Sequence, residues 1–204
     1  MSRLSPSDAI RQIDAPPEVA ARLGVYIDLL AKWNAKINLV GPNTLDDSWR
    51  RHILDSGQLL SYLPETPGVL VDLGSGAGLP GLILAILTSW QVHLIESDSR
   101  KCVFLREAAR VTGTNVTIHN TRIEAAPAIA ADVVTARALA PLDKLLPLAA
   151  RFLKPDGRAV FLKGARWAEE LTDAQKSWHM GVSDYPSRTD PAARILLLEQ
   201  LARG

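Results

Sequence analysis

An acidic residue followed by a run of glycines is the part of this chain best suited to chemistry. Asp72 lies near the end of an apolar segment at 69–73, and Gly74, Gly76 and Gly78 follow it. A ligand can approach glycine backbone closely, because no side chain stands in the way. An apolar strand that runs into such a turn and then into a helix is typical of a nucleotide-cofactor site in an α/β fold.

The glycines fit two different cofactor motifs. Gly76, Gly78 and Gly81 satisfy the G-x-G-x-x-G pattern of dinucleotide-binding folds. Gly74, Gly76 and Gly78 form G-x-G-x-G with Asp72 ahead of them, which resembles motif I of the class I S-adenosylmethionine-dependent methyltransferases. A carboxylate repels a pyrophosphate but suits a ligand that carries a sulfonium and an amino group. We therefore favour S-adenosylmethionine as the cofactor, with a nicotinamide-dependent oxidoreductase as the alternative.

Two further segments have the composition of a cofactor site. Glu96 follows the strand predicted at 91–95 and lies about twenty residues beyond the glycine turn, where this fold places an acid for ribose hydroxyls. The alternative for Glu96 is a first-turn acid that stabilises a helix. Ile123 and Glu124 follow the strand predicted at 116–119, and this pair suits an adenine ring and its amine. A solvated loop is an equally good interpretation of that segment.

Two cations follow later strands. Arg137 comes after the strand predicted at 132–135, and Lys163 comes after the strand predicted at 159–162. Ligands of open α/β sheets bind outside the carboxyl ends of the strands, so both residues are expected to face the reaction space. Arg137 suits a cofactor carboxylate or a substrate phosphate, and Lys163 a phosphate or simply solvent.

These residues require a sheet to position them, and the pattern from residue 69 onward supplies one. Short apolar runs alternate with helical periodicity, which predicts a mostly parallel sheet covered on both faces. The remaining strands are predicted at 69–73, 178–183 and 194–199, and the helices from about 79, then at 100–111, 142–153 and 167–177. Residues 18–62 read as helices, including one at 45–63. Two prolines and a glycine at 64–68 place the boundary between an N-terminal helical segment, 1–66, and a cofactor-binding domain, 67–204.

Composition excludes several classes of protein. A chain of 204 residues with 47% hydrophobic residues can bury a core, and a net charge of +1 gives no general signal for nucleic acid. The single cysteine and four dispersed histidines predict no metal site. The N-terminus lacks the apolar core of a signal peptide, and no apolar stretch is long enough to span a bilayer. We therefore expect a cytoplasmic protein without a membrane partner.

Two N-terminal segments point to one family. Trp33-Asn34-Ala35-Lys36-Ile37-Asn38-Leu39 and Arg51-His52-Ile53-Leu54-Asp55-Ser56 resemble the W-N-x-x-x-N-L and R-H-I-L-D-S segments of the bacterial small-subunit ribosomal RNA methyltransferase G family, also called glucose-inhibited division protein B. Gly78-Leu79-Pro80-Gly81, Arg137-Ala138 and Leu162-Lys163-Gly164 also fit. The resemblance covers the chain from about residue 26 to the C-terminus.

The resemblance implies a class I methyltransferase fold, a Rossmann-like three-layer α/β sandwich with a mostly parallel central sheet and an N-terminal helical extension. It implies methyl transfer from S-adenosylmethionine to N7 of a guanine in the decoding-region loop of 16S ribosomal RNA. The substrate is then the RNA or the small-subunit particle, and we expect a monomer. A non-catalytic RNA-binding assembly factor on the same scaffold is a further alternative.

The resemblance also assigns residues. The expected cofactor contacts are Asp72, Gly74, Gly76, Gly78, Leu79, Glu96, Ile123, Glu124 and Arg137, and the expected substrate contacts are His52, Asp55 and Lys163. Guanine N7 carries a lone pair and no proton, so the reaction needs no general base. We expect no catalytic residue in the strict sense, with Arg137 and Lys163 positioning the substrate. The acidic, proline-containing motif of many amino-methylases is absent after the strand at 132–135, in agreement with this mechanism.

Overall fold

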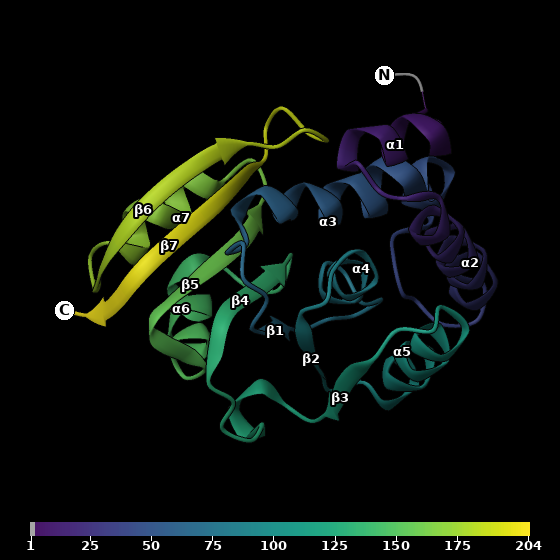
Figure 1. The fold of residues 1–204 in the computed structure, drawn as a ribbon. Helices are drawn as coiled ribbons and strands as arrows, with labels where there is room; N and C mark the ends of the chain where they lie inside the picture. The colour runs from purple at the N-terminus through teal and green to yellow at the C-terminus, as the bar shows by residue number, and fades with distance from the viewer. Residues whose placement is uncertain (1–2) are drawn as a thin grey trace.

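The computed structural model describes residues 3–204 and contains a seven-stranded sheet with helices on both faces (Figure 1). The strands are β1 (Val69–Leu73), β2 (Gln91–Glu96), β3 (Val116–Asn120), β4 (Ala131–Arg137), β5 (Leu153–Lys163), β6 (Trp178–Pro186) and β7 (Arg194–Arg203). They are arranged in the order β3-β2-β1-β4-β5-β7-β6, and β7 runs in the opposite direction to the other six strands. The predicted α/β class with a mostly parallel sheet is confirmed.

The strand order creates a crevice at the carboxyl edge of the sheet. The chain runs outward from β1 to β2 and β3, then returns to β4 on the other side of β1 and continues to β5. The connections after β1 and β4 therefore leave toward opposite sides of the sheet. A ligand-binding crevice is expected between two such neighbouring strand ends.

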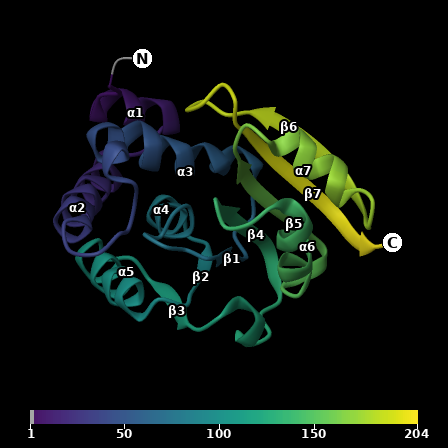
Figure 2. The same ribbon diagram turned by 180° about the vertical axis from the view of Figure 1, so that it is seen from behind.

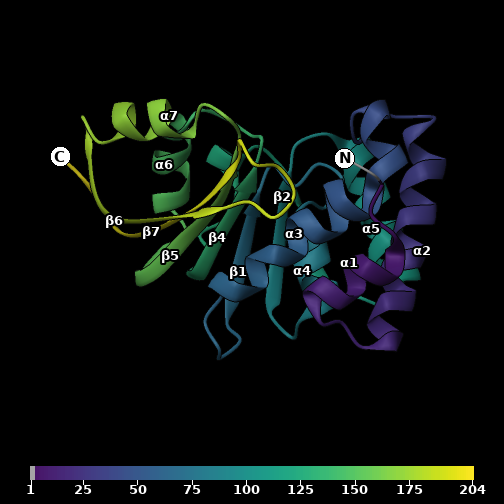
Figure 3. The same ribbon diagram turned by 90° about the horizontal axis from the view of Figure 1, so that it is seen from above.

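Two helical layers cover the sheet (Figure 3). The helices α4 (Gly81–Leu87) and α5 (Ser99–Val111) pack on one face, and α6 (Leu142–Ala150) and α7 (Trp167–Ala174) on the other. Alternate residues of β1 explain this arrangement, because Leu70 belongs to the first core cluster and Val71 and Leu73 belong to the second. The result is the predicted three-layer sandwich.

The N-terminal residues add helices outside the first layer. These elements are α1 (Pro6–Ile13), α2 (Pro17–Asn34), η1 (Pro42–Asp47), η2 (Trp49–Leu54), α3 (Asp55–Gly57) and η3 (Gln58–Tyr62). Figures 1 and 2 show α1 and α2 at one end of the molecule and the β6–β7 hairpin at the other. Leu23, Tyr26 and Leu30 of α2 are fully buried in the same core cluster as Leu82 of α4. The N-terminal helices thus complete the core of the first layer.

Three elements differ from the sequence prediction. The helix predicted at 45–63 consists of 3-10, π and α turns in succession, which a search for the α-helical period does not distinguish. The helix predicted at 142–153 ends at Ala150, because Leu153 pairs with Ala131 as the first residue of β5. The helix α1 lies ahead of the predicted helical region. No helix within 3–204 has the length and apolar character needed to cross a bilayer.

Candidate active site

Two adjoining cavities lie at the carboxyl edge of the sheet. The cavity beside the glycine turn, called the turn pocket here, has a volume of about 390 Å³. The cavity between the ends of β4 and β5 and the N-terminal helices, called the outer pocket, has a volume of about 510 Å³. Residues 137–140 line both cavities and separate them.

Most of the predicted site residues meet in these two pockets. The turn pocket is lined by Gly74, Gly76, Glu96, Ile123, Glu124 and Arg137. The outer pocket is lined by His52, Asp55, Arg137 and Lys163. Asp72, Gly78 and Leu79 line neither cavity.

The glycine turn forms one wall of the turn pocket. Gly74 and Gly76 have φ angles of 64° and 56°, a region in which a side chain costs roughly 1–2 kcal/mol. A Cβ on Gly74 would lie 2.5 Å from Cδ1 of Leu139, so the turn and residues 138–140 approach each other too closely for any side chain. At Gly74 the packing as well as the backbone conformation disfavours a side chain, whereas a Cβ on Gly76 would meet nothing closer than 3.9 Å.

Glu96 connects the end of β2 to the glycine turn. Its side chain is buried, and its two carboxylate oxygens accept N–H bonds from Gly76 (2.9 Å) and Asp98 (2.8 Å). A carboxylate offers about four lone-pair sites, so each oxygen retains acceptor capacity. Glu96 can therefore hold the turn and accept hydroxyl groups from a ligand at the same time.

The segment after β3 also lines the turn pocket. Ile123 and Glu124 belong to a single 3-10 turn, η4 (Ile123–Ala125), and both line the pocket. The guanidinium of Arg151 donates to the carbonyl of Ile123 (3.0 Å) and fixes this turn. An apolar side chain, an acid and Glu96 thus surround one cavity, as a nucleoside requires.

Asp72 lies beneath the glycine turn instead of in the turn pocket. Its carboxylate is buried, and one oxygen accepts the hydroxyl of Thr135 (2.7 Å). The other oxygen is buried without a hydrogen-bond partner among the described residues. Burial raises the pKa of Asp72 to about 6, against the opposing effect of hydrogen bonds to the carboxylate. A Cβ on Gly81 would lie 2.6 Å from the Cβ of Asp72, so the acid also fixes where α4 begins.

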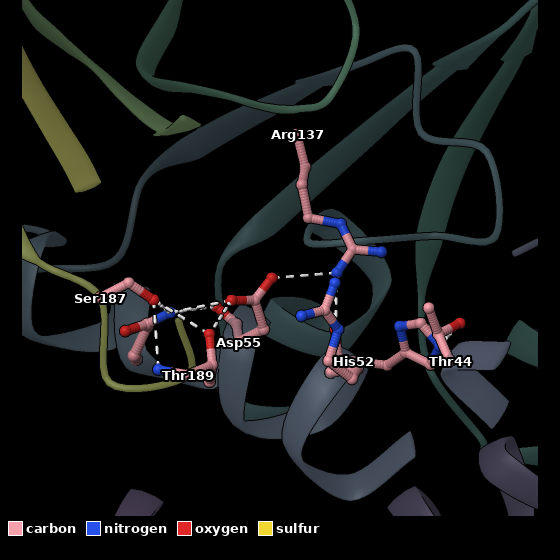
Figure 4. A network of polar contacts seen from close by, with 8 residues as sticks. Thr44, His52, Asp55, Arg137, Ser187 and Thr189 are labelled. Carbon is pink, nitrogen blue, oxygen red and sulfur yellow. Dashed lines mark hydrogen bonds and ion pairs between the residues drawn. The ribbon is translucent and has the colours of Figure 1, made fainter. Parts of the chain in front are cut away.

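Arg137 lies at the junction of the two pockets (Figure 4). It is the last residue of β4, and its Nη1 donates to the carbonyl of Arg51 (2.8 Å) and to Oδ2 of Asp55 (3.0 Å). Both partners belong to the N-terminal helical segment, which the Arg137 side chain therefore ties to the sheet. The guanidinium carries further N–H donors that remain for a ligand carboxylate or phosphate.

The carboxylate of Asp55 is held from its other side by the β6–β7 connection. Its Oδ1 accepts the hydroxyl of Thr189 (2.5 Å) and the side-chain amide of Gln58 (3.1 Å). Ser187 lies 2.9 Å from the Thr189 hydroxyl and 3.3 Å from the Gln58 amide (Figure 4). Sequence reasoning missed Ser187 and Thr189, because no motif links residues more than a hundred positions apart, and it missed Gln58 although this residue lies only three positions from Asp55.

His52 contributes a neutral ring to the outer pocket. Its Nε2 lies 3.0 Å from the hydroxyl of Thr44, and that hydroxyl donates to the carbonyl of Gly41 (2.6 Å). Because the Thr44 hydroxyl has only one hydrogen, His52 Nε2 is the donor to Thr44. Burial, followed by the positive charge of Arg137, lowers the pKa of His52 to about 4. His52 is therefore uncharged at neutral pH.

Lys163 is buried and already paired. Its Nζ donates to the carbonyl of Ala140 (2.8 Å) and lies 2.5 Å from a carboxylate oxygen of Glu170. The same Glu170 oxygen accepts the backbone N–H of Leu142 at the start of α6 (3.0 Å). Lys163 thus holds residues 138–142 in place and meets a ligand only through the side of the ammonium that faces the outer pocket.

Two histidines that are far apart in the sequence lie together on β2 and β3. Nδ1 of His93 is 3.0 Å from Nε2 of His119, and the rings stack at 5.3 Å between centroids. The sequence spacing gave no indication of this pair. Among residues 3–204, no group of three or more His, Cys, Asp or Glu side chains is arranged to hold a metal ion.

Comparison with known proteins agrees with the geometry of the site. A family model described as "GidB: rRNA small subunit methyltransferase G" matches residues 20–191. Ribosomal RNA small subunit methyltransferase G of Rhodospirillum centenum is 59% identical over 91% of this chain and 86% of that protein. The protein of the same name from Paramagnetospirillum magneticum is 51% identical over 98% of each chain.

A solved structure supports the fold independently. A methyltransferase from Pyrococcus furiosus is 17% identical and superposes with a TM-score of 0.59, covering 87% of this chain and 95% of the other. At this level of identity the similarity concerns the class I methyltransferase fold. The family match, together with relatives that align over nearly the full length, shows that the chain belongs to the rRNA small subunit methyltransferase G family.

Proposed function

We propose that this protein transfers a methyl group from S-adenosylmethionine to N7 of a guanine in the decoding-region loop of 16S ribosomal RNA. Membership of the family makes the protein a methyltransferase with S-adenosylmethionine as its donor. The choice of guanine N7 is supported by the character of the outer pocket. We further propose that the protein acts in the cytoplasm as a monomer, on the RNA or on the small-subunit particle.

The residues of the turn pocket fit the donor. Gly74 and Gly76 present bare backbone, Glu96 offers carboxylate oxygens to ribose hydroxyls, and Ile123 and Glu124 suit the adenine and its amine. Arg137 lies at the other end of this pocket, where its free N–H groups can pair with the methionine carboxylate. When bound, S-adenosylmethionine supplies an electrophilic methyl carbon attached to a sulfonium sulfur.

The remaining predicted cofactor residues support the pocket from behind. Asp72 ties the end of β1 to β4 through Thr135, and it leaves no room for a side chain at Gly81, where α4 begins. Gly78 and Leu79 continue the turn, with N–H bonds from both to the carbonyl of Ser75. Their proposed contribution is the shape of the turn instead of direct contact with the donor.

The outer pocket is suited to a nucleophile that needs no base. The acids that line it are Asp55, Glu170 and Asp190, and each carboxylate already has a partner, in Arg137, Lys163 and the Ala192 backbone N–H. His52 is neutral because its pKa is lowered to about 4. Guanine N7 attacks with an in-plane lone pair and releases no proton. The pairing of Asp55 and Glu170 with cations leaves neither carboxylate free to take a proton, and this is the observation that most favours N7 over an amino group.

The task left to the protein is positioning. Alignment of two reactants in a near-attack arrangement can lower a barrier by roughly 7–11 kcal/mol in favourable systems. Arg137, held by Asp55 and Arg51, and Lys163, held by Glu170, are placed to fix the RNA near the junction of the two pockets. The guanine must reach this junction unstacked, which favours a loop over an intact helix.

Two measurements test the proposal. Parallel calorimetric titrations of the purified protein with S-adenosylmethionine and with NAD are expected to detect binding of the first and not of the second. Tritium from labelled methyl groups is then expected to appear in deproteinised or partly assembled small-subunit RNA. Donor binding without any transfer to such RNA would contradict the proposed substrate and favour a non-catalytic role.

A further inference from the structure

A third cavity lies outside the two pockets, between α2 and α5. It is a groove of about 710 Å³ lined by Lys32, Trp33, Lys36, Ile37, Arg100 and Val103. We call it the α2–α5 groove. Its floor is apolar, and its rim carries three cations. Nothing in the methyl-transfer site described above uses this groove.

The floor of the groove is rigid and open to solvent. The Trp33 ring packs edge-on against Phe104, with 5.8 Å between ring centroids, and Phe104 is fully buried. Val103, the residue before Phe104 on α5, is 49% exposed, which is unusual for a large apolar side chain among the described residues. A fixed indole beside an exposed apolar side chain offers a surface on which a flat ring can stack.

The rim of the groove is positively charged. Lys32 lies in the last turn of α2, and Lys36 lies two residues beyond the end of that helix. Both are exposed, and neither forms an ion pair with any residue among 3–204. Arg100 is paired with Asp98 (2.9 Å), which compensates that one charge. Lys32 and Lys36 therefore give the rim two ammonium groups that no carboxylate among the described residues compensates. The occupant that complements them is an anion.

The groove and the substrate side of the site are lined by neighbouring segments of the chain. Lys36 and Ile37 line the groove, and the chain then continues directly to Leu39, Val40 and Gly41, which line the outer pocket. On α5, Arg100 lines the groove, and its neighbour Lys101 lines the turn pocket. Residues 36–41 and 100–101 therefore connect the lining of the groove to the linings of the two pockets along the chain.

We propose that the α2–α5 groove binds an unpaired nucleotide of the RNA substrate that flanks the methylated guanine. The base stacks on Trp33 and Val103, and the adjoining phosphates pair with Lys32 and Lys36. Stacking on aromatic residues combined with backbone cations is the usual way in which proteins hold single-stranded RNA. The inference rests on RNA as the substrate of the outer pocket, and it adds a second, non-catalytic contact to that site.

The test compares two variants that lose the same charge. Lys32→Gln/Lys36→Gln removes two cations from the groove, and Lys176→Gln/Arg203→Gln removes two exposed cations from the opposite end of the molecule. The probe is a fluorescent 12-nucleotide single-stranded RNA with the full-length protein. Each lost phosphate contact lowers the salt dependence of single-strand binding by about 0.7 in log–log slope. We expect the slope to fall by about 1.4 and the affinity to fall about tenfold in the groove variant only.

The stacking surface is tested separately. Val103→Glu changes an exposed position and leaves the core intact. It is expected to lower the affinity for the 12-nucleotide RNA about tenfold. Trp33→Leu is expected to lower the affinity of the protein for RNA and to leave its affinity for poly-glutamate unchanged, because a peptide chain offers no base to stack. Thermal unfolding of each variant verifies that it is folded.

Three outcomes would overturn the groove assignment. The first is that the groove variant and the charge-matched control bind the single-stranded RNA with equal affinity. The second is that the unchanged protein binds double-stranded RNA as tightly as single-stranded RNA, and the third is that it binds poly-glutamate as tightly as RNA. The last result would identify an acidic protein segment as the occupant. A groove that behaves as proposed in a protein that transfers no methyl group would instead overturn the proposed function alone.

Discussion

The buried carboxyl of Asp72 makes the stability of the protein depend on pH. Its pKa is near 4 in the unfolded chain and about 6 in the folded protein, so between these values the folded state binds a proton that the unfolded state lacks. Stability from this group is therefore fully present below pH 4 and is lost as the pH rises through 6. Two pKa units correspond to about 3 kcal/mol.

Asp72→Asn isolates this effect. The difference in unfolding free energy between the variant and the unchanged protein is expected to move in favour of the variant, by up to about 3 kcal/mol, from pH 4 to pH 7. Urea unfolding at several pH values measures it, and other titrating groups such as His52 cancel in the difference. A difference that stays constant across this range would contradict a raised pKa for Asp72.

Glu96 provides a direct test of the turn pocket. Glu96→Gln removes the charge that the ribose hydroxyls are proposed to meet, and a charged hydrogen bond contributes about 1.5–3 kcal/mol. We expect the affinity for S-adenosylmethionine to fall at least tenfold, with Arg137→Ala also weakening it. Glu107→Gln, on the exposed side of α5, is the control. Equal affinity of the Glu96 and Glu107 variants for S-adenosylmethionine, measured by calorimetry, would show that Glu96 does not contribute to donor binding.

At the scale of secondary-structure elements, one hydrogen bond joins the helix α2 to the glycine turn. The hydroxyl of Tyr26, fully buried, donates to the carbonyl of Ala77 (2.8 Å). Tyr26→Phe leaves that carbonyl buried without a partner and is expected to cost about 1–3 kcal/mol of stability. It should also weaken donor binding, because the turn loses an anchor.

Tyr62→Phe is the matched control for the tyrosine on α2. Tyr62 packs against Tyr185, and its hydroxyl forms no hydrogen bond with the described residues. Thermal and urea unfolding of both variants give the comparison. Equal stability of the two phenylalanine variants would show that the hydrogen bond between α2 and the turn does not contribute to the free energy of unfolding.

The existence of the strands was largely predictable, because short apolar runs bounded by turn residues are a local signal. Their order in the sheet was not predicted, because pairing between strands is decided by tertiary contacts. The boundaries at 150–153 were not, because Leu153 joins the sheet through its pairing with Ala131. The same holds for the turns at 45–63, where the chain changes helical pitch while keeping its apolar residues on the core side. Tertiary pairing decides such boundaries, and it leaves no local trace in the sequence.

The site residues divide in the same way. Glu96, Ile123, Glu124 and Arg137 were predictable because each follows a strand that ends at one edge of the sheet. The partners of Asp55 were not, because Thr189 reaches Asp55 across 134 positions of the chain. The burial of Asp72 and Lys163 was also hidden, since a charged residue at a strand end reads as solvated until its partner is known.

For the whole molecule, we propose that residues 1–66 complete the core of the domain formed by 67–204. Leu23, Tyr26 and Leu30 are fully buried in the cluster that contains Leu82. Removal of 1–66 would expose this apolar face, so the fragment 67–204 is expected to aggregate and to lose cooperative unfolding. Circular dichroism and size exclusion measure this. A fragment that melts cooperatively near the temperature of the full chain would contradict it.

The most direct test of the proposed function is to find where the methyl group goes. The protein is incubated with 16S ribosomal RNA and donor that carries a trideuterated methyl group, and the RNA is digested to nucleosides for mass spectrometry with methylguanosine standards. We expect deuterium in N7-methylguanosine alone, and none with heat-inactivated protein. Deuterium in a guanine methylated at its amino group, in another base, or in no nucleoside at all would contradict the account.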